Sequence, residues 1–290
     1  MKIAAFLHQG QPAVGIVSAD LASVQPFDMS AAERALGALP VIERLADGRG
    51  LPALLPAIAM SALRLTAPLP KPRRNIFCVG KNYFEHAREF AGSGFDSSAK
   101  SGGDIPAFPI YFSKVPESVI GPDAAVQMPA ASSAIDYEAE LTVVIGKGGK
   151  GISKADALKH VWGYTIINDV TARDWQGRHS QWLLGKSFDT FCPMGPWLVS
   201  ADELDGTNTR VRCYVNDELR QDAATTDLIF DIPTLIETLS AGITIYPGDL
   251  IATGTPVGVG IGFKPPKYLK SGDMLRVEID GIGALRNPVR

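Results

Sequence analysis

Short apolar runs, separated by glycine, proline and polar residues, cover most of this chain. Many of the runs are rich in β-branched residues, a pattern typical of buried or half-buried β-strands. Two of them, from Leu250 and from Met274, follow Gly-Asp turns. The pattern therefore predicts an α+β fold that is mainly β. The clearest other predicted strands are Asn75–Val79, Ile110–Lys114, Leu141–Ile145 and Trp162–Ile167.

Helical spacing of apolar positions occurs in three stretches of the sequence. Ala31–Ala46 reads as one helix, and Ser153–Lys159 reads as a short helix that Ser153 caps. In Thr226–Leu239, Pro233 is expected to be the first helical residue. Because these helices do not alternate regularly with strands, we do not expect a doubly wound parallel sheet.

The first 70 residues are predicted to form a small N-terminal α/β domain, separate from residues 71–290. Met1–Phe6 and Pro12–Ser18 form a predicted hairpin with its turn at Gln9-Gly10-Gln11. A proline-rich stretch at 67–72 is typical of a linker and marks the boundary.

Residues 91–107 contain few apolar side chains and many Gly, Ser and Asp residues. A segment of this composition buries little surface, so we expect it to be mobile. It lies between His86 and the predicted strand Ile110–Lys114. The segment is either a lid over a catalytic residue or an ordinary surface loop.

Glu138 and Glu140 are two residues apart at the start of a predicted strand. Residues at this spacing point to the same face, and two buried like charges are costly unless a cation or a proton neutralises them. Asp169 follows the run Trp162–Ile167 and offers a third carboxylate. Three oxygen ligands with room for water suit Mg²⁺ or Mn²⁺. The sequence therefore predicts a metal site formed by Glu138, Glu140 and Asp169.

His86 and Glu89 are three residues apart and share a face if the segment is helical. A carboxylate that fixes the tautomer of an imidazole prepares it for general acid–base catalysis. The alternative is a surface ion pair. Lys186 lies between apolar residues and Ser187, where it can stabilise an oxyanion. The alternative for Lys186 is a lysine that reaches out to solvent.

Arg173 and Gln176 follow Asp169 at four and seven residues, so on a helix they face the same pocket. Arginine is a natural partner for carboxylates. The glycine-rich stretch 254–260 lacks the Gly-Lys-Ser/Thr ending of a phosphate-binding loop. Thr255 and backbone N–H groups in this stretch are candidates for binding substrate oxygens. The alternative is that the stretch is only a turn.

The composition narrows the class of protein. A formal net charge of −3 argues against a nucleic-acid-binding surface. No apolar run approaches the roughly 18 residues that cross a bilayer, and the N-terminus does not resemble a secretory signal. The three cysteines are widely spaced, which favours reduced thiols in a cytoplasmic protein. No membrane partner and no nucleic-acid partner are expected.

Taken together, these segments resemble the fumarylacetoacetate hydrolase family, in particular its fumarylacetoacetase-domain proteins with acylpyruvase or tautomerase activity. In the fumarylacetoacetase of tyrosine breakdown, an acidic ligand stands where this chain has Val79. The segments that carry the resemblance are Gly80-Lys81-Asn82-Tyr83 with His86 and Glu89, Asp136 to Glu140, Asn168 to Gln176, Gly185 to Asp189, and Tyr246 to Pro256.

The resemblance implies a rolled β-sheet in residues 71–290, the catalytic domain, and a homodimer. It implies one Mg²⁺ or Mn²⁺ per subunit, held by Glu138, Glu140 and Asp169, at a site that can also take Ca²⁺ in crystals. Catalysis is assigned by the same resemblance to His86, Glu89 and Lys186. Substrate binding is assigned to Tyr83, Arg173, Gln176 and Thr255.

The expected reaction is hydrolysis of a carbon–carbon bond in a β-diketo acid of the acylpyruvate or fumarylpyruvate type. His86, oriented by Glu89, activates water, and an enolate forms at the metal. The same enolate also serves a tautomerase or isomerase of oxaloacetate or 2-hydroxymuconate-type diacids, and a decarboxylase of 2-oxo acids. A non-enzymatic, metal-stabilised binding protein is the remaining alternative, although such a protein does not need the His86–Glu89 pair.

Overall fold

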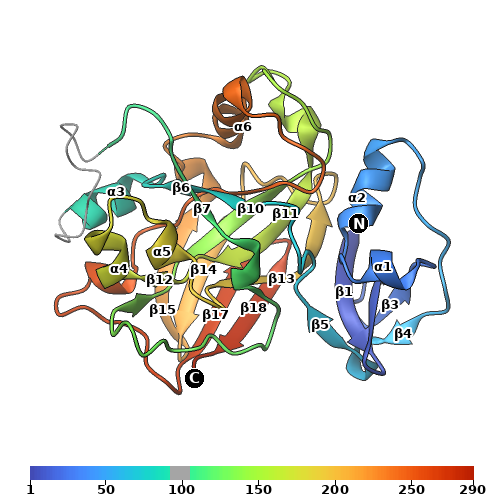
Figure 1. The fold of residues 1–290 in the computed structure, drawn as a ribbon, viewed down its shortest axis with the longest axis horizontal. Helices are drawn as coiled ribbons and strands as arrows, with labels where there is room; N and C mark the ends of the chain where they lie inside the picture. The colour runs from blue at the N-terminus through green and yellow to red at the C-terminus, as the bar shows by residue number, and fades with distance from the viewer. Residues whose placement is uncertain (92–104) are drawn as a thin grey trace.

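A computed structural model describes residues 1–91 and 105–290 of the chain (Figure 1). The predicted α+β fold that is mainly β is confirmed. The helices are α1 (Ala31–Arg34), α2 (Leu39–Ala46), α3 (Phe84–Ala91), α4 (Arg173–Arg178), α5 (Leu183–Lys186) and α6 (Ile232–Gly242).

Within the described residues, twelve strands form one sheet. Its main path runs β4-β3-β2-β1-β13-β11-β10-β16-β6-β7, while β5 pairs with β1 and β8 pairs with β13. These strands are β1 (Lys2–His8), β2 (Gln11–Val17), β3 (Ser23–Pro26), β4 (Ile58–Ala59), β5 (Arg64–Thr66), β6 (Ile76–Gly80), β7 (Ile110–Lys114), β8 (Val119–Ile120), β10 (Ala139–Ile145), β11 (Val161–Asn168), β13 (Cys192–Ser200) and β16 (Leu250–Ala252).

A second sheet has the order β15-β14-β17-β18, and the short pair β9 and β12 lies apart from it. The large sheet and the second sheet face each other across the main core, which includes Leu141 and Val143 from β10 and Val211 and Val277 from the second sheet. Every residue of β10 is buried, so this strand lies between covered layers. These strands are β9 (Ile135–Asp136), β12 (Thr171–Ala172), β14 (Arg210–Val215), β15 (Glu218–Ala224), β17 (Met274–Ile279) and β18 (Gly283–Pro288).

The N-terminal strands lie to one side of the molecule in Figure 1 and join the large sheet through β1 and β13. Lys2 pairs with Val199, and Ile3 pairs with Leu198. The hairpin of β1 and β2 forms as predicted, with the turn after His8. The domain boundary at residue 70 stays a prediction.

Three helix predictions need correction. The helix predicted at Ala31–Ala46 is two helices, α1 and α2, because Gly37 between them has φ +64°, in the left-handed region. The helix predicted at Ser153–Lys159 is only a 3₁₀ turn at Ala157–His160. There the Ser153 hydroxyl donates to the Asp156 carboxylate instead of capping a helix.

The third correction concerns Thr226–Leu239, where α6 begins only at Ile232. Asp231 caps this helix by accepting a hydrogen bond from the Thr234 N–H, so Pro233 is the second helical residue and not the first. In the described part of the chain, no helix combines the length and apolar character needed to cross a bilayer. The predicted lid or loop at 91–107 lies mostly outside the described residues.

Candidate metal centre

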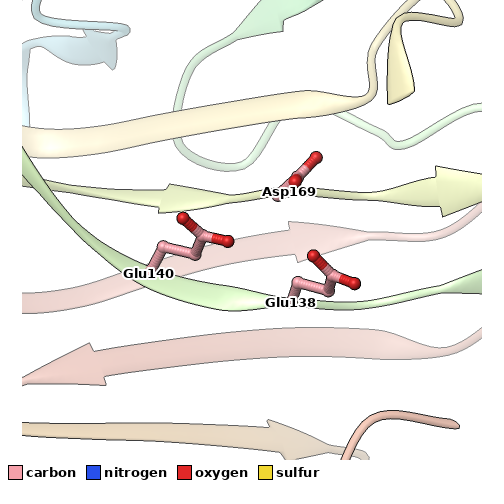
Figure 2. Close-up of side chains that lie close together, drawn as sticks. All are labelled: Glu138, Glu140 and Asp169. Atoms are coloured by element: carbon pink, nitrogen blue, oxygen red, sulfur yellow. The ribbon is translucent and has the colours of Figure 1, made fainter. Parts of the chain in front are cut away.

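The pairing of β10 with β11 brings the three predicted acids together. Ala139 pairs with Asn168 in this antiparallel ladder, and the Asp169 N–H donates to the Glu138 carbonyl over 2.8 Å. Asp169 therefore lies opposite Glu138, while Glu140 projects to the same side two residues along the chain. Figure 2 shows the three side chains close together, Glu138 and Glu140 on one segment and Asp169 on the neighbouring one.

The three carboxylates form one buried cluster. One oxygen from each of Glu138, Glu140 and Asp169 lies within 4.8 Å of the others. Their exposed fractions are 4%, 1% and 0%. The sequence-based expectation that the three acids lie together is therefore met in the structure.

Three cations lie against this cluster. The Lys186 ammonium is 2.7 Å from both Glu138 and Asp169. Lys114, fully buried, is 2.6 Å from the other Asp169 oxygen and also donates to the Lys186 carbonyl. The Arg173 guanidinium is 2.6 Å from Glu138. Lys186 thus lies between two predicted metal ligands, and the alternative of a lysine reaching to solvent is wrong.

The three cations neutralise Glu138 and Glu140 to different extents. Burial alone would raise the pKa of Glu138, but the charges of Lys186 and Arg173 outweigh it and lower the pKa to about 2. Burial raises the pKa of Glu140 well above its usual value, and the charges of Asp169 and Glu138 raise it further. Within the described residues, Glu140 accepts one hydrogen bond, from the Gly254 N–H over 2.8 Å, and forms no ion pair.

This donor set fits a divalent cation. The three groups offer carboxylate oxygens, which Mg²⁺ and Mn²⁺ prefer. Burial and the charges of Asp169 and Glu138 raise the pKa of Glu140 more than the charge of Lys186 lowers it, and a divalent ion would favour its ionised form. Glu138, Glu140 and Asp169 are therefore the residues that would hold the ion, and the identity of the ion stays open.

The His86–Glu89 pair lies on α3 beside the acids. The His86 Nδ1 is 3.2 Å from a Glu89 carboxylate oxygen, and His86 is only 5% exposed. His86 lines the same pocket as Glu138 and Glu140. The alternative of a surface ion pair is therefore wrong, because the imidazole is buried at the site.

Arg173, Gln176 and Thr255 also line this pocket. Arg173 and Gln176 lie on one face of α4, where Arg173 donates to the Gln176 side-chain oxygen over 3.0 Å. Gln221, a residue that no sequence motif singles out, donates to the Thr255 hydroxyl over 2.8 Å. Tyr83 is buried but does not line the pocket, so its predicted substrate contact stays a prediction.

Sequence reasoning missed part of the wall of this pocket. Phe112 and Trp182 form an apolar side, with ring centroids 5.3 Å apart in an edge-to-face arrangement. Lys81 also lines the pocket, next to Gly80. Lys81 belongs to the segment Gly80-Lys81-Asn82-Tyr83, which carries the family resemblance, but it was not assigned a role. Phe112 and Trp182 stand in no such motif, so only the fold brings them to the site.

Comparisons with known proteins show the family of the chain. The family model described as fumarylacetoacetate (FAA) hydrolase, C-terminal, matches residues 75–290. Oxaloacetate tautomerase YisK of Bacillus subtilis (strain 168) is 51% identical over 233 residues, which cover 80% of this chain and 74% of that protein.

Solved structures extend the likeness to the whole chain. Fumarylacetoacetate hydrolase (EaFAH) from psychrophilic Exiguobacterium antarcticum is 38% identical with a TM-score of 0.83, covering 100% of this chain and 99% of that one. Maleylpyruvate hydrolase from Sphingobium sp. SYK-6, in complex with manganese(II) ion and pyruvate, is 30% identical with a TM-score of 0.78, covering 100% and 98%. The likeness confirms the predicted rolled-sheet fold. The chain is therefore a member of the fumarylacetoacetate hydrolase family of enzymes.

Proposed function

We propose that this protein is a divalent-metal-dependent keto–enol tautomerase of small 2-oxo diacids, with oxaloacetate as the first candidate substrate. The observation that carries the proposal is the buried triad Glu138, Glu140 and Asp169 in one pocket with His86, whose Nδ1 is engaged by Glu89. The similarity to the B. subtilis oxaloacetate tautomerase favours this reaction over the hydrolysis that the sequence first suggested.

The charge of the site supports an anionic substrate. When all are ionised, four buried acids carry four negative charges: Asp136, Glu138, Glu140 and Asp169. The three cations beside them, Lys114, Arg173 and Lys186, carry three positive charges, which leaves one negative charge in excess. A bound divalent ion would turn this excess of one negative charge into an excess of one positive charge. An incoming carboxylate then meets a complementary field.

The size of the pocket supports a compact substrate. Its free volume is only about 10 Å³, which is room for roughly one water molecule. Phe112 and Trp182 close one side with apolar surface. A four-carbon diacid suits this space better than a long acyl chain.

When bound, the divalent cation would contact substrate oxygens and stabilise negative charge on the 2-oxo group. The His86 Nδ1 donates to Glu89, so proton transfer is assigned to Nε2. In the enolisation direction, Nε2 takes a proton from C3 of the keto form. The C3–H electron pair then forms the C2=C3 bond, and the C2=O pair moves to oxygen. The proton is then returned to that oxygen.

The remaining pocket residues bind and orient the substrate. Lys186 carries a full positive charge next to Glu138 and Asp169, because these acids outweigh the effect of burial and raise its pKa. It stabilises the charge that develops on the substrate oxygen. Arg173, Gln176 and the Thr255 hydroxyl, which Gln221 orients, are the proposed contacts for the substrate carboxylates.

Carbon–carbon bond hydrolysis of acylpyruvates is the second candidate. The similarity to maleylpyruvate hydrolase over the full chain supports it, and the same His86–Glu89 pair would activate the water. These two reactions and decarboxylation differ in their products: tautomerisation releases no fragment, hydrolysis of oxaloacetate gives oxalate and acetate, and decarboxylation gives pyruvate and CO₂.

The test is to follow the enol absorbance of oxaloacetate with Mn²⁺ present and to analyse the products by ¹³C NMR. A tautomerase accelerates the approach to keto–enol equilibrium and leaves the carbon skeleton intact. His86→Ala is expected to remove this acceleration while the protein still binds Mn²⁺. An unchanged enol decay rate, or fragments formed at the rate of enol loss, would contradict the proposal.

A further inference from the structure

The glycine-rich segment after β16 holds the carboxylate of Glu89. The Gly258 N–H donates to both Glu89 oxygens, at 3.1 and 3.2 Å. A Cβ at Gly262 would lie 1.8 Å from a Glu89 oxygen and 2.2 Å from its carboxyl carbon. Residues 258–262 thus form a backbone cradle in which the carboxylate fits only because position 262 has no side chain. We call these residues the glycine cradle.

Asp136 holds the glycine cradle in place through hydrogen bonds. Its carboxylate accepts hydrogen bonds from the Gly260 N–H at 2.6 Å and the Ile261 N–H at 3.0 Å. The neighbouring Tyr137 donates its hydroxyl to the Gly258 carbonyl over 2.9 Å. Asp136 and Tyr137 therefore hold the cradle at several points, and both residues are completely buried.

Arg173 connects Asp136 to the metal cluster. The Asp136 oxygen that accepts from the Ile261 N–H also lies 2.8 Å from the Arg173 Nε, and the same guanidinium is 2.6 Å from Glu138. One buried carboxylate thus connects the acid that would hold the cation with the loop that holds the partner of His86. Neither of these contacts is local in sequence: Gly260 lies 124 residues after Asp136.

We propose that Asp136 is a positioning residue for the His86–Glu89 pair, which acts by fixing the glycine cradle against the metal cluster. A carboxylate suits this role because it accepts several N–H groups at once, whereas an asparagine would turn its own N–H₂ group toward one pair of these donors. The cradle sets where Glu89 lies, and Glu89 in turn sets the orientation of the His86 imidazole. The kinetic part of this proposal rests on the proposed function, since it is read from turnover of oxaloacetate.

The sharpest test is Gly262→Ala, which pushes Glu89 from the cradle without touching Asp136. Gly262 does not have the left-handed φ that penalises alanine, and the three atoms that a Cβ there would approach most closely all belong to Glu89. Gly242→Ala is the matched control, because a Cβ there meets nothing within 4 Å. Hydrogen exchange of residues 84–89 reports directly whether α3 is released, whatever reaction the enzyme catalyses.

In Gly262→Ala, exchange in α3 is expected to accelerate about ten-fold, while Gly242→Ala stays at the wild-type rate. The kcat is expected to fall about 100-fold, with KM and Mn²⁺ affinity changed less than about two-fold. In a Glu89→Ala background, Gly262→Ala has no carboxylate to displace, so its further effect on kcat is expected to vanish. An exchange rate in Gly262→Ala equal to that of the wild type would contradict the proposed role of the glycine cradle. A full additive loss of kcat in the double variant would contradict it as well.

Asp136→Asn tests the second step, with Asp249→Asn as its control. Asp249 is also buried and accepts from the Tyr246 N–H and from Arg74, but it lies outside the pocket. Asp136→Asn is expected to accelerate exchange in α3 and to lose kcat, and Asp249→Asn to lose only thermal stability. If both variants leave α3 equally protected, Asp136 has no positioning role. If turnover is absent even in the wild type, the proposed function fails. The exchange result still shows whether the glycine cradle positions Glu89.

Discussion

Replacing Arg173 with methionine is expected to destabilise the protein through the buried charges that Arg173 neutralises. Arg173 is 1% exposed and lies within 2.8 Å of Asp136 and 2.6 Å of Glu138. Methionine keeps much of the apolar volume, so the loss reports the missing charge and hydrogen bonds more than a cavity. Removing one partner of a buried ion pair costs about 3–5 kcal/mol, because the other charge stays buried.

The structure places the expected loss at the lower end of that range. Asp136 keeps the N–H groups of Tyr137, Gly260 and Ile261 as donors. Glu138 keeps the ammonium of Lys186 at 2.7 Å. Since both acids retain partners, we expect the free energy of unfolding to fall by about 3 kcal/mol. For a domain of this size the melting temperature would drop by roughly 6–12 °C.

Urea unfolding followed by circular dichroism measures this change. Arg210→Met is the control, because Arg210 pairs with Asp222 at the surface, where its side chain is 46% exposed. An exposed pair of this kind contributes less than about 1 kcal/mol. If Arg173→Met is no more destabilising than Arg210→Met, the buried network does not carry the energy assigned to it.

Three further predictions concern the metal and the pocket. Removal of divalent ions with EDTA is expected to abolish turnover, and Mn²⁺ or Mg²⁺ to restore it; full activity in EDTA would exclude the metal site. Because the pKa of Glu140 is raised above 4.5, protons compete with the ion, so Mn²⁺ affinity measured by EPR is expected to strengthen as the pH rises through that raised pKa. Affinity that does not change with pH would contradict this assignment. Trp182→Ala removes part of the apolar wall beside Gly80. It is expected to raise kcat/KM for acylpyruvates with larger acyl groups relative to kcat/KM for oxaloacetate. An unchanged ratio would show that the wall does not select for size.

The metal cluster could be predicted because its information is local. Glu138 and Glu140 are two residues apart beside a long apolar strand, and Asp169 ends another. Antiparallel pairing of these two strands then places Asp169 opposite Glu138. Side-chain alternation along a strand and the cost of burying like charges were enough to find this part of the site.

Other parts of the molecule depend on contacts that no local pattern reports. Lys114 ends an apolar strand and is fully buried against Asp169, 55 residues later, although Glu117 is a much closer acid in sequence. The break between α1 and α2 has a similar origin. A Cβ at Gly37 would lie 2.4 Å from the carbonyl oxygen of Pro68, so tertiary packing fixes a turn where the apolar spacing predicts a continuous helix.

The three acids at positions 136, 138 and 140 show why spacing alone does not assign roles. They alternate along one short segment, yet their partners differ. Asp136 accepts three backbone N–H groups and one guanidinium, so its charge is used inside the fold. Glu138 is shared between Lys186 and Arg173. Glu140 has one backbone donor and no ion pair among the described residues.

These differences predict three separate outcomes for the same substitution of acid by amide. Glu140→Gln is expected to weaken Mn²⁺ binding with the smallest loss of stability, because it removes a charge that the fold does not neutralise. Glu138→Gln is expected to weaken Mn²⁺ binding and also destabilise the protein, because it strips Lys186 and Arg173 of a shared partner. Asp136→Asn is expected to destabilise and to slow turnover with Mn²⁺ binding retained. Calorimetric Mn²⁺ titration and urea unfolding of the three variants measure this ranking, and equal losses in all three would refute it.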